Sequence, residues 1–276
     1  MKITCVVDNA VEHASSLWGE HGLAFVVEVG DRKILFDTGQ SGTVLLHNLE
    51  RLRMEPRTFA AIAVSHGHAD HTGGLIPFLK RAPGLPLVAH PDFRTKRFAA
   101  RKKKDPRLIG PAGKGKEIRK LAKLRLDAGM VEILPDLWTT GEIRKRPHPE
   151  GRSPRHLIRL RDGSYVRDLY RDDLSLVWKG DDGLVVILGC AHAGVLNILA
   201  QVAADFQRPI KAVVGGMHLH GAEPAQLEHI VGALAETYDG LSAYPNHCTG
   251  IDGFLALQSK LGGRVKPCPV GTVLEF

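Results

Sequence analysis

Residues 65–74 of the chain read SHGHADHTGG. Three imidazoles (His66, His68 and His71) and the carboxylate of Asp70 therefore fall within a short turn. The stretch follows a short apolar run that predicts a buried strand, and it precedes a predicted helix. Its glycines allow the backbone to bend tightly enough to aim the side chains at a common point. Imidazole and carboxylate groups at this density predict a metal site.

Three further histidines follow predicted strands in the same way. His192 lies in GCAHAG after an apolar run at residues 184–188, and His218 lies in GGMH after a second run at residues 210–214. His247 lies in PNHCTG, shortly after a short predicted strand. Because strand ends gather at one edge of a sheet, all three imidazoles can reach the site of the first motif.

An acid precedes the motif at the end of a predicted hairpin strand. Asp37 lies in FDTG. It could orient a ligand imidazole through the second ring nitrogen, or hold the histidine loop by hydrogen bonds. A local Asx turn explains an aspartate at this position equally well.

The cysteines are interpreted differently. Cys5, Cys190, Cys248 and Cys268 form no C-x-x-C pair and are too few for a disulfide framework, so we expect reduced thiols. Cys190 and Cys248 adjoin the late histidines and could ligate a metal, but small buried side chains are their expected role.

Strand and helix patterns around these motifs predict the fold class. Apolar runs predict strands at residues 3–7, 24–29, 33–36, 60–64, 85–89, 174–178, 184–188 and 210–214, with a short one ending near residue 244. Helical spacing predicts helices at residues 41–52, 75–79, 114–129, 195–206, 226–238 and 254–261. The sequence therefore predicts an α/β (α+β) protein: a single domain over residues 1–276, with two mixed β-sheets packed face to face inside an outer helical layer.

Residues 92–171 depart from this pattern and are expected to be a basic insertion. The stretch contains Pro- and Gly-rich sequence and most of the cations behind the net charge of +7. Its densest block comprises Arg101, Lys102, Lys103 and Lys104. Such a block can bind an anionic substrate or nucleic acid, or it can be a solvated helix face.

Composition excludes several classes of protein. The 276 residues are 43% hydrophobic and 24% charged, which is ordinary for a globular chain. No apolar run approaches the roughly 18 to 20 residues of a membrane-spanning helix. The first residues reach an acid too soon for a signal peptide, so we expect a cytoplasmic protein without membrane contact. A G-x-S-x-G elbow and a P-loop are both missing from the sequence.

The motifs together resemble the metallo-β-lactamase fold superfamily. The FDTG segment, H-x-H-x-D-H and the later isolated histidines occur in the order typical of that superfamily over nearly the whole chain. The phrases GCAHAGVLNI, GGMHL and NHCTG resemble its branch of dihydropterin–ribofuranosylaminobenzene 5′-phosphate synthases and related metallo-hydrolases. The resemblance implies a four-layer αββα sandwich with a dinuclear metal site at one edge.

The resemblance also implies a division of the ligands. His66, His68 and a late histidine, His192 or alternatively His218, would bind the first metal ion. Asp70, His71 and His247 would bind the second. Zinc suits this set, although manganese and iron also accept imidazole and carboxylate ligands. Many superfamily members supply a bridging aspartate that this chain lacks, which leaves hydroxide as the only bridge or weakens the second site.

A catalytic hypothesis follows from that site. We expect a metal-dependent hydrolase that acts on a small anionic, phosphate-bearing substrate. In this hypothesis metal-bound hydroxide is the nucleophile, and Asp70 and His71 are the catalytic residues beside it. The alternative is a transferase that condenses a dihydropterin methyl diphosphate with an aryl ribosyl phosphate. A second alternative is nucleic-acid processing, but aromatic residues make up only 6% of the chain and are not interleaved with the cations. Oligomeric state is not predicted.

Overall fold

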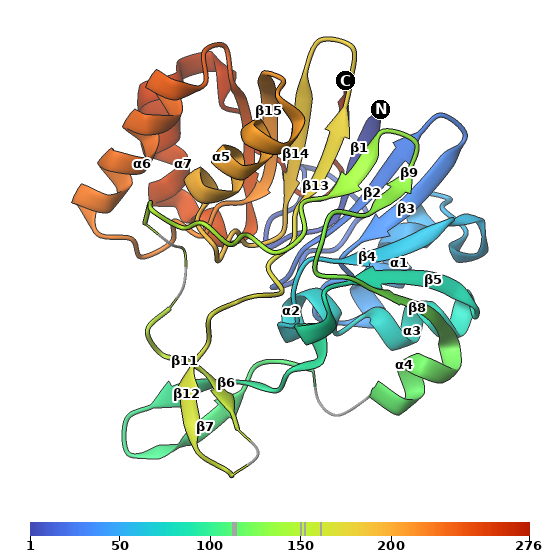
Figure 1. Cartoon of the computed structure of the whole chain (residues 1–276). Coiled ribbons are helices and arrows are strands. Elements are labelled where there is room, and N and C mark those ends of the chain that lie inside the picture. The colour runs from blue at the N-terminus through green and yellow to red at the C-terminus, as the bar shows by residue number, and fades with distance from the viewer. Residues whose placement is uncertain (112–114, 150, 152, 161) are drawn as a thin grey trace.

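The computed structural model describes residues 1–111, 115–149, 151, 153–160 and 162–276. Two large sheets lie face to face and helices cover their outer faces, as Figure 1 shows. The chain begins and ends in the same region of the fold, where the amino group of Met1 donates to a carbonyl oxygen of Phe276 at 2.7 Å. This arrangement confirms the predicted αββα sandwich.

The first large sheet is mixed and has the strand order β17-β1-β2-β3-β4-β5-β8. Its strands are β1 (Lys2–Val7), β2 (Ala24–Val29), β3 (Arg32–Phe36), β4 (Ala61–Val64), β5 (Leu85–Ala89), β8 (Ala122–Leu126) and β17 (Val273–Glu275). The hairpin between β2 and β3 turns at Gly30, whose φ of 60° suits glycine. From β3 onward the neighbours are parallel, so the ends of β3 and β4 deliver Asp37 and the histidine motif to the same edge.

The second large sheet has the order β16-β15-β14-β13-β10-β9. Its strands are β9 (Glu132–Leu134), β10 (Leu137–Thr139), β13 (Leu176–Lys179), β14 (Leu184–Leu188), β15 (Ile210–Gly216) and β16 (Ser242–Asn246). Strands β14, β15 and β16 are parallel neighbours, which brings the segments after them, and thus His192, His218 and His247, to one edge.

Helices cover the two outer faces. They are α1 (Gly42–Arg51), α2 (Ala69–Thr72), α3 (Leu75–Arg81), α4 (Gly115–Leu121), α5 (Val195–Phe206), α6 (Pro224–Thr237) and α7 (Gly250–Leu261). Ser41 caps α1, because its side chain accepts a hydrogen bond from the backbone of Val44. Among the described residues, no helix combines the length and the apolar character that a membrane crossing requires.

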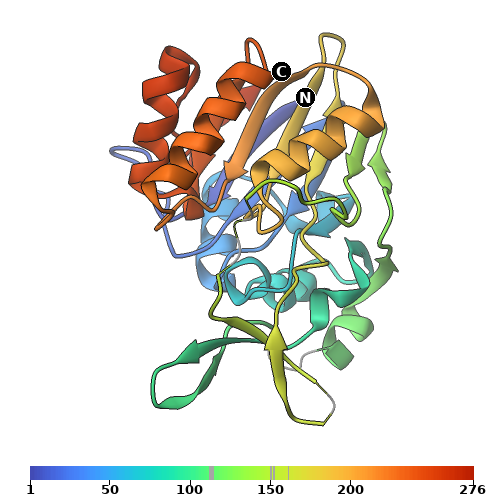
Figure 2. The same cartoon turned by 60° about the vertical axis from the view of Figure 1, so that its left-hand side comes forward.

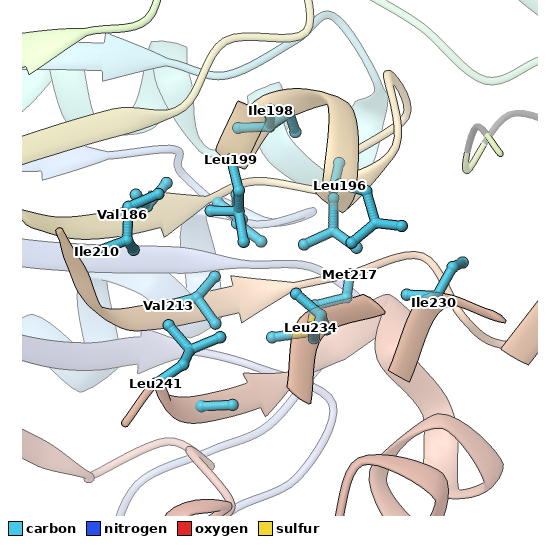
Figure 3. Close-up of a cluster of buried hydrophobic side chains, with 14 of the residues drawn as sticks. Val186, Leu196, Ile198, Leu199, Ile210, Val213, Met217, Ile230, Leu234 and Leu241 are labelled. Carbon is cyan, nitrogen blue, oxygen red and sulfur yellow. The ribbon is translucent and has the colours of Figure 1, made fainter. Parts of the chain in front are cut away.

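Three apolar clusters hold the layers together. One contains Ile34, Phe36 and Val185 and lies between the sheets. A second packs α1 and α3 on the first sheet. The third packs α5, α6 and α7 on the second sheet, and Figure 3 shows part of it, with Leu199 and Leu234 meeting the strands. The central strands are buried on both faces, as their nearly continuous apolar sequences require.

The helix expected over residues 114–129 is wrong in its second half. Residue 114 lies outside the described residues, α4 ends at Leu121, and β8 begins at once and pairs in parallel with β5. The apolar Leu124 and Leu126 alternate with the cations Lys123 and Arg125. That period of two suits a half-buried strand at a sheet edge.

The stretch expected as a basic insertion, residues 92–171, has two kinds of structure. Residues 122–139 contribute β8, β9 and β10 to the large sheets. The flanking segments form a separate four-stranded sheet, which we call the accessory sheet. It consists of β6 (Arg97–Arg101), β7 (Lys104–Leu108), β11 (His156–Arg159) and β12 (Tyr165–Arg167). Figures 1 and 2 show it projecting from the sandwich beyond α2.

Candidate metal centre

Three imidazoles converge at the edge where both large sheets end. His66 and His68 lie on the turn between β4 and α2, and His192 lies after β14. His66 Nε2 is 3.1 Å from His68 Nδ1 and 3.3 Å from His192 Nε2. One nitrogen from each ring thus lies within 4.8 Å of the others, as in a shared metal site. We call this group the three-histidine cluster.

The tautomers of this cluster suit a cation. The outer nitrogen of His66, Nδ1, donates to Ser65 Oγ at 2.9 Å, and Nδ1 of His192 donates to the carbonyl oxygen of Gly151 at 3.2 Å. Each inner Nε2 therefore keeps a lone pair, which is the usual arrangement of a metal-binding histidine. His68 Nε2 is buried without a hydrogen-bond partner among the described residues.

Burial also keeps these rings neutral. Desolvation lowers the pKa of His66, His68 and His192 well below its ordinary value, and the neighbouring imidazoles lower the pKa of His66 and His192 further. Neutral imidazole is the form that binds a metal ion. The donor set therefore fits a divalent metal.

A second group of donors lies beside the first, around the carboxylate of Asp70. Asp70 Oδ2 is 3.4 Å from His247 Nε2, 3.7 Å from His71 Nε2 and 3.3 Å from His21 Nε2. His247 Nδ1 is hydrogen-bonded to Asn9 Oδ1 at 2.9 Å, so its inner nitrogen is also free to bind. The structure thus brings Asp70 close to both other members of the second expected set, His71 and His247. Among the described residues, however, the candidate donor group that contains Asp70 and His247 has the exposed His21 as its third member, and His71 is grouped with His66 and Cys190.

Asp37 connects the two groups. Its carboxylate accepts hydrogen bonds from Ser65 N at 2.7 Å and Ser65 Oγ at 2.6 Å, and it binds His71 Nδ1 at 2.7 Å. Burial lowers the pKa of His71, but the charges of Asp37 and Asp70 outweigh burial and raise that pKa to about 9. Asp37 has a φ of 60°, which is uncommon for a residue with a side chain. The aspartate therefore holds both the histidine turn and one imidazole.

The backbone at the centre is strained in several places. Ala191, His218 and His247 have φ values of 54°, 49° and 48°. Non-glycine residues in this left-handed region concentrate at functional sites, where the surrounding structure holds them. Asp8 holds His247 in this conformation by accepting its backbone N–H at 2.8 Å. Burial raises the pKa of Asp8 to about 6.

Cys190 lies between the two groups of donors. Its Sγ is 3.1 Å from His71 Nε2. The thiol shares one possible metal-binding group with His66 and His71, and a second with His247 and Cys248. Burial raises the pKa of Cys190 well above its usual value, as expected for a small buried side chain. The same position also makes Cys190 a candidate ligand, in the region where the sequence supplies no bridging carboxylate.

The structure distinguishes between His192 and His218, the two late histidines that the sequence offered as alternative ligands of the first metal ion. The ring of His218 lies 4.5 Å from the ring of His192 and faces the same cleft. Among the described residues, however, the three-histidine cluster contains His192 and not His218. His218 is therefore placed as a wall of the cleft.

The donors open into a cleft of about 660 Å³. Its lining residues are Asn9, His21, Gln40, His68, Ala69, Asp70, Arg107, Leu108, Ile109, His156, Cys190, His192, His218, His220, His247, Cys248 and Gly250. Of these described residues, Arg107 alone carries a fixed positive charge, and the described part of the chain offers its guanidinium no hydrogen bond or ion pair. Arg101, Lys102, Lys103 and Lys104 are exposed around the turn between β6 and β7 and do not line the cleft.

Two further residues at the site come from the region of irregular sequence. The ring of Tyr170 stacks on His192, with centroids 4.0 Å apart and an interplanar angle of 14°. The hydroxyl of Tyr170 contacts His156 Nδ1, and His156 lines the cleft. No sequence motif marked Arg107, His156 or Tyr170, because their approach to the centre depends on how the accessory sheet packs.

Comparison with known proteins finds a matching family model and several full-length relatives. A family model described as the metallo-beta-lactamase superfamily matches residues 17–166. The chain is 29% identical to a 7,8-dihydropterin-6-methyl-4-(beta-D-ribofuranosyl)-aminobenzene-5'-phosphate synthase of Methanocaldococcus jannaschii, over 100% of this chain and 97% of that protein. It is 30% identical to an uncharacterised protein of the same organism, over 92% of this chain and 93% of the relative.

A solved structure has the same architecture over its whole length. The chain superposes on Tm1679, described as a metal-dependent hydrolase of the beta-lactamase superfamily, with a TM-score of 0.85 and 28% sequence identity. The superposition covers 100% of this chain and 99% of that one. The two full-length relatives thus carry different descriptions, one a synthase and one a hydrolase.

Proposed function

Because this chain belongs to the metallo-β-lactamase superfamily, we propose that it is a metal-dependent enzyme that hydrolyses a small anionic, phosphate-bearing molecule. One observation carries the proposal. The inner nitrogens of His66, His68 and His192 converge while the outer nitrogens of His66 and His192 are held by hydrogen bonds. Zinc, manganese or iron at this cluster and at Asp70, His71 and His247 would supply Lewis acidity and a lowered pKa of bound water.

Other residues at the cleft have separate roles in this proposal. Asp70 Oδ2 lies at the junction of the second group, where its carboxylate can orient a nucleophile and hold a ligand position. Asp37 fixes the orientation of His71. Arg107 lines the cleft, and its guanidinium has no hydrogen bond or ion pair within the described residues, while arginine pairs well with phosphate oxygens. An anionic group bound there would lie in the same cleft as the donors.

The second candidate is a condensation. The relative from Methanocaldococcus jannaschii, 29% identical over the full chain, is described as a 7,8-dihydropterin-6-methyl-4-(beta-D-ribofuranosyl)-aminobenzene-5'-phosphate synthase. In a condensation, the same centre would stabilise a departing diphosphate, and Arg107 would bind the phosphate of either substrate. Both reactions need the donor cluster and a site for an anion, so the arrangement of residues in the cleft is compatible with either reaction.

Product analysis separates the two reactions. Metal-loaded protein is incubated in ¹⁸O-labelled water with a panel of phosphomonoesters, phosphodiesters and diphosphates, and separately with a dihydropterin methyl diphosphate plus an aryl ribosyl phosphate. Hydrolysis predicts ¹⁸O in the product from a single substrate. Pyrophosphate release that requires both organic substrates, with no hydrolysis of either one alone, would show that the reaction is a condensation and not a hydrolysis. DNA or RNA cleavage, with binding that weakens steeply as salt rises, would favour the nucleic-acid alternative.

A further inference from the structure

A charged arginine is buried beneath the histidine turn. Arg97 begins β6 of the accessory sheet, and its side chain is only 2% exposed. Its Nε donates to Asp168 Oδ2 at 2.6 Å, and its Nη2 donates to Asp172 Oδ1 at 2.5 Å. Both carboxylates are buried as well. A buried ion triad contributes little to stability as such, because the cost of desolvating the charges offsets their attraction. The groups that the triad contacts therefore indicate what it does.

One carboxylate of this triad holds the turn that carries two metal-binding candidates. Asp172 Oδ2 accepts the backbone N–H of Gly67 at 2.8 Å, and Gly67 separates His66 from His68. The guanidinium also packs directly on this turn, because a Cβ on Gly67 would lie 2.6 Å from Arg97 Nη1. Arg97 thus fixes the turn from below through charge and through close packing.

The backbone of Arg97 holds the other side of His68. The carbonyl oxygen of Arg97 accepts the N–H of Ile109 at 2.8 Å, and the carbonyl oxygen of Ile109 accepts the N–H of Ala69 at 2.8 Å. Ala69 follows His68 directly. The residues on both sides of this imidazole are therefore hydrogen-bonded to groups that Arg97 positions.

The second carboxylate reaches the third histidine. Asp168 Oδ1 accepts the backbone N–H of Tyr170 at 2.8 Å, and the Tyr170 ring stacks on His192 at 4.0 Å between centroids. Arg97 therefore connects to all three members of the three-histidine cluster. Different side chains hold the outer nitrogens of the second group, since Asp37 binds His71 and Asn9 binds His247.

We propose that Arg97, with Asp168 and Asp172, is a positioning residue that sets the metal affinity of the three-histidine cluster and leaves the Asp70–His71–His247 group largely unaffected. The inference rests on the proposed metal binding. It makes the accessory sheet part of the metal centre, because β6 and the end of β7 carry the groups that hold the turn. Groups of this kind, which orient ligands without touching the metal, typically change metal affinity by about 10- to 100-fold when they are altered.

The test uses Arg97→Lys in the full chain. Lysine keeps the charge but has no fork that spans two carboxylates, so the turn and Tyr170 lose their common anchor. The metal-free protein is titrated with Co²⁺ against a chelator, and the visible spectrum of bound cobalt is followed. We expect one equivalent to bind about 10- to 100-fold more weakly with an altered spectrum, while the other equivalent keeps its affinity.

Two further variants keep the test decisive. Asp168→Asn is nearly isosteric, and it should weaken the same equivalent if Arg97→Lys does not fold. Asn48→Ala is the control, because Asn48 is buried and hydrogen-bonded to the carbonyls of Val6 and Trp18, and none of these three belongs to a candidate donor group of the described residues or contacts the Arg97 triad. We expect Asn48→Ala to lower the melting temperature without changing either affinity.

Two results would overturn the inference while leaving the proposed function intact. One is a folded Arg97→Lys protein that binds both equivalents as the wild type does. The other is an equal loss of affinity in Asn48→Ala at a matched melting temperature. If the wild-type protein bound no cobalt at all, the proposed function would fail together with the inference.

Discussion

At the scale of single residues, four imidazoles of the centre are each held by at least one contact with a neighbouring residue. His66 is held by Ser65, His71 by Asp37, His192 by Gly151 and Tyr170, and His247 by Asn9. Each contact uses the outer nitrogen or the ring face and leaves the inner nitrogen directed toward the centre. The arrangement is therefore preorganised for a cation at His66, His192 and His247, whereas His71, whose pKa is raised to about 9, must lose a proton when a metal ion binds.

The two late histidines provide a direct comparison. We expect His192→Ala to lose most of one metal equivalent, because its Nε2 belongs to the three-histidine cluster. His218→Ala should keep the metal content of the wild type, because that ring lies beside the cluster without joining it. Inductively coupled plasma mass spectrometry of both variants measures the difference. Equal losses in the two variants would contradict the assignment.

Cys190 gives a spectroscopic prediction. Its sulfur is 3.1 Å from His71 Nε2 and lies within reach of donors from both groups. We expect cobalt-loaded protein to show a thiolate-to-cobalt charge-transfer band in the near ultraviolet that Cys190→Ser loses. Cys268→Ser is the matched control, because Cys268 is equally buried and belongs to no candidate donor group of the described residues. A band that survives Cys190→Ser would leave Cys190 as a buried thiol.

Local sequence identified most of the residues that converge at the edge of the sheets, but not the residues that hold them there. The motif at His66–His71 and the strand-end histidines concentrate polar groups where apolar runs stop, and that signal is visible without a structure. Tyr170 and Arg107 carry no such signal, because they reach the centre only through long-range packing of the accessory sheet. The sequence alone left two roles open for Asp37, namely holding the histidine turn or one of its imidazoles and forming a local Asx turn. Its contacts with Ser65 and His71 support the first role.

At the scale of elements, the accessory sheet is the feature that sequence patterns describe least well. Its strands are short and partly exposed, so they lack the continuous apolar runs that revealed the central strands. The error in the second half of the helix expected over residues 114–129 has a similar cause. Apolar residues at 118, 121, 124 and 126 satisfy a helical spacing approximately, but the alternation from Ala122 onward is the period of a strand.

The accessory sheet also provides the test of substrate charge. Arg107 on β7 lines the cleft, whereas Arg101 on β6 lies at the exposed end of the same hairpin. We expect Arg107→Met to raise KM for a phosphorylated substrate about tenfold or more with a smaller change in kcat, because the arginine binds the phosphate in the ground state and the transition state alike. Arg101→Met is the control and should leave KM unchanged. If Arg101→Met raised KM and Arg107→Met did not, the exposed block of cations would be the site of anion binding.

At the scale of the whole molecule, the donor cluster affects stability. Burial lowers the pKa of six histidines at the centre, namely His66, His68, His156, His192, His218 and His247. In the unfolded chain these imidazoles take up protons at about pH 6.5. Below that pH the unfolded state therefore binds more protons than the folded state, and the free energy of unfolding falls as the pH falls.

Other groups act in the opposite sense. Asp8 and Asp173 have pKa values that burial raises to about 6 and about 7, so they favour the folded state at low pH, but they are outnumbered. His71, with its pKa raised to about 9, contributes stability below about pH 6.5 that is lost as the pH approaches 9. We expect the stability of the metal-free protein to be highest near neutral pH and to fall on acidification. Urea unfolding across a pH series measures this, and a stability that increased toward acid would contradict it.

The central claim is that these donors bind divalent metal ions, and metal content tests it most directly. Protein is stripped with a chelator, reloaded with Zn²⁺, separated from free metal by gel filtration and analysed by inductively coupled plasma mass spectrometry, with His68→Ala measured beside the wild type. The account predicts two equivalents in the wild type and the loss of about one in the variant. Wild-type protein that retains no stoichiometric metal, or a His68→Ala variant that retains the same amount as the wild type, would contradict it.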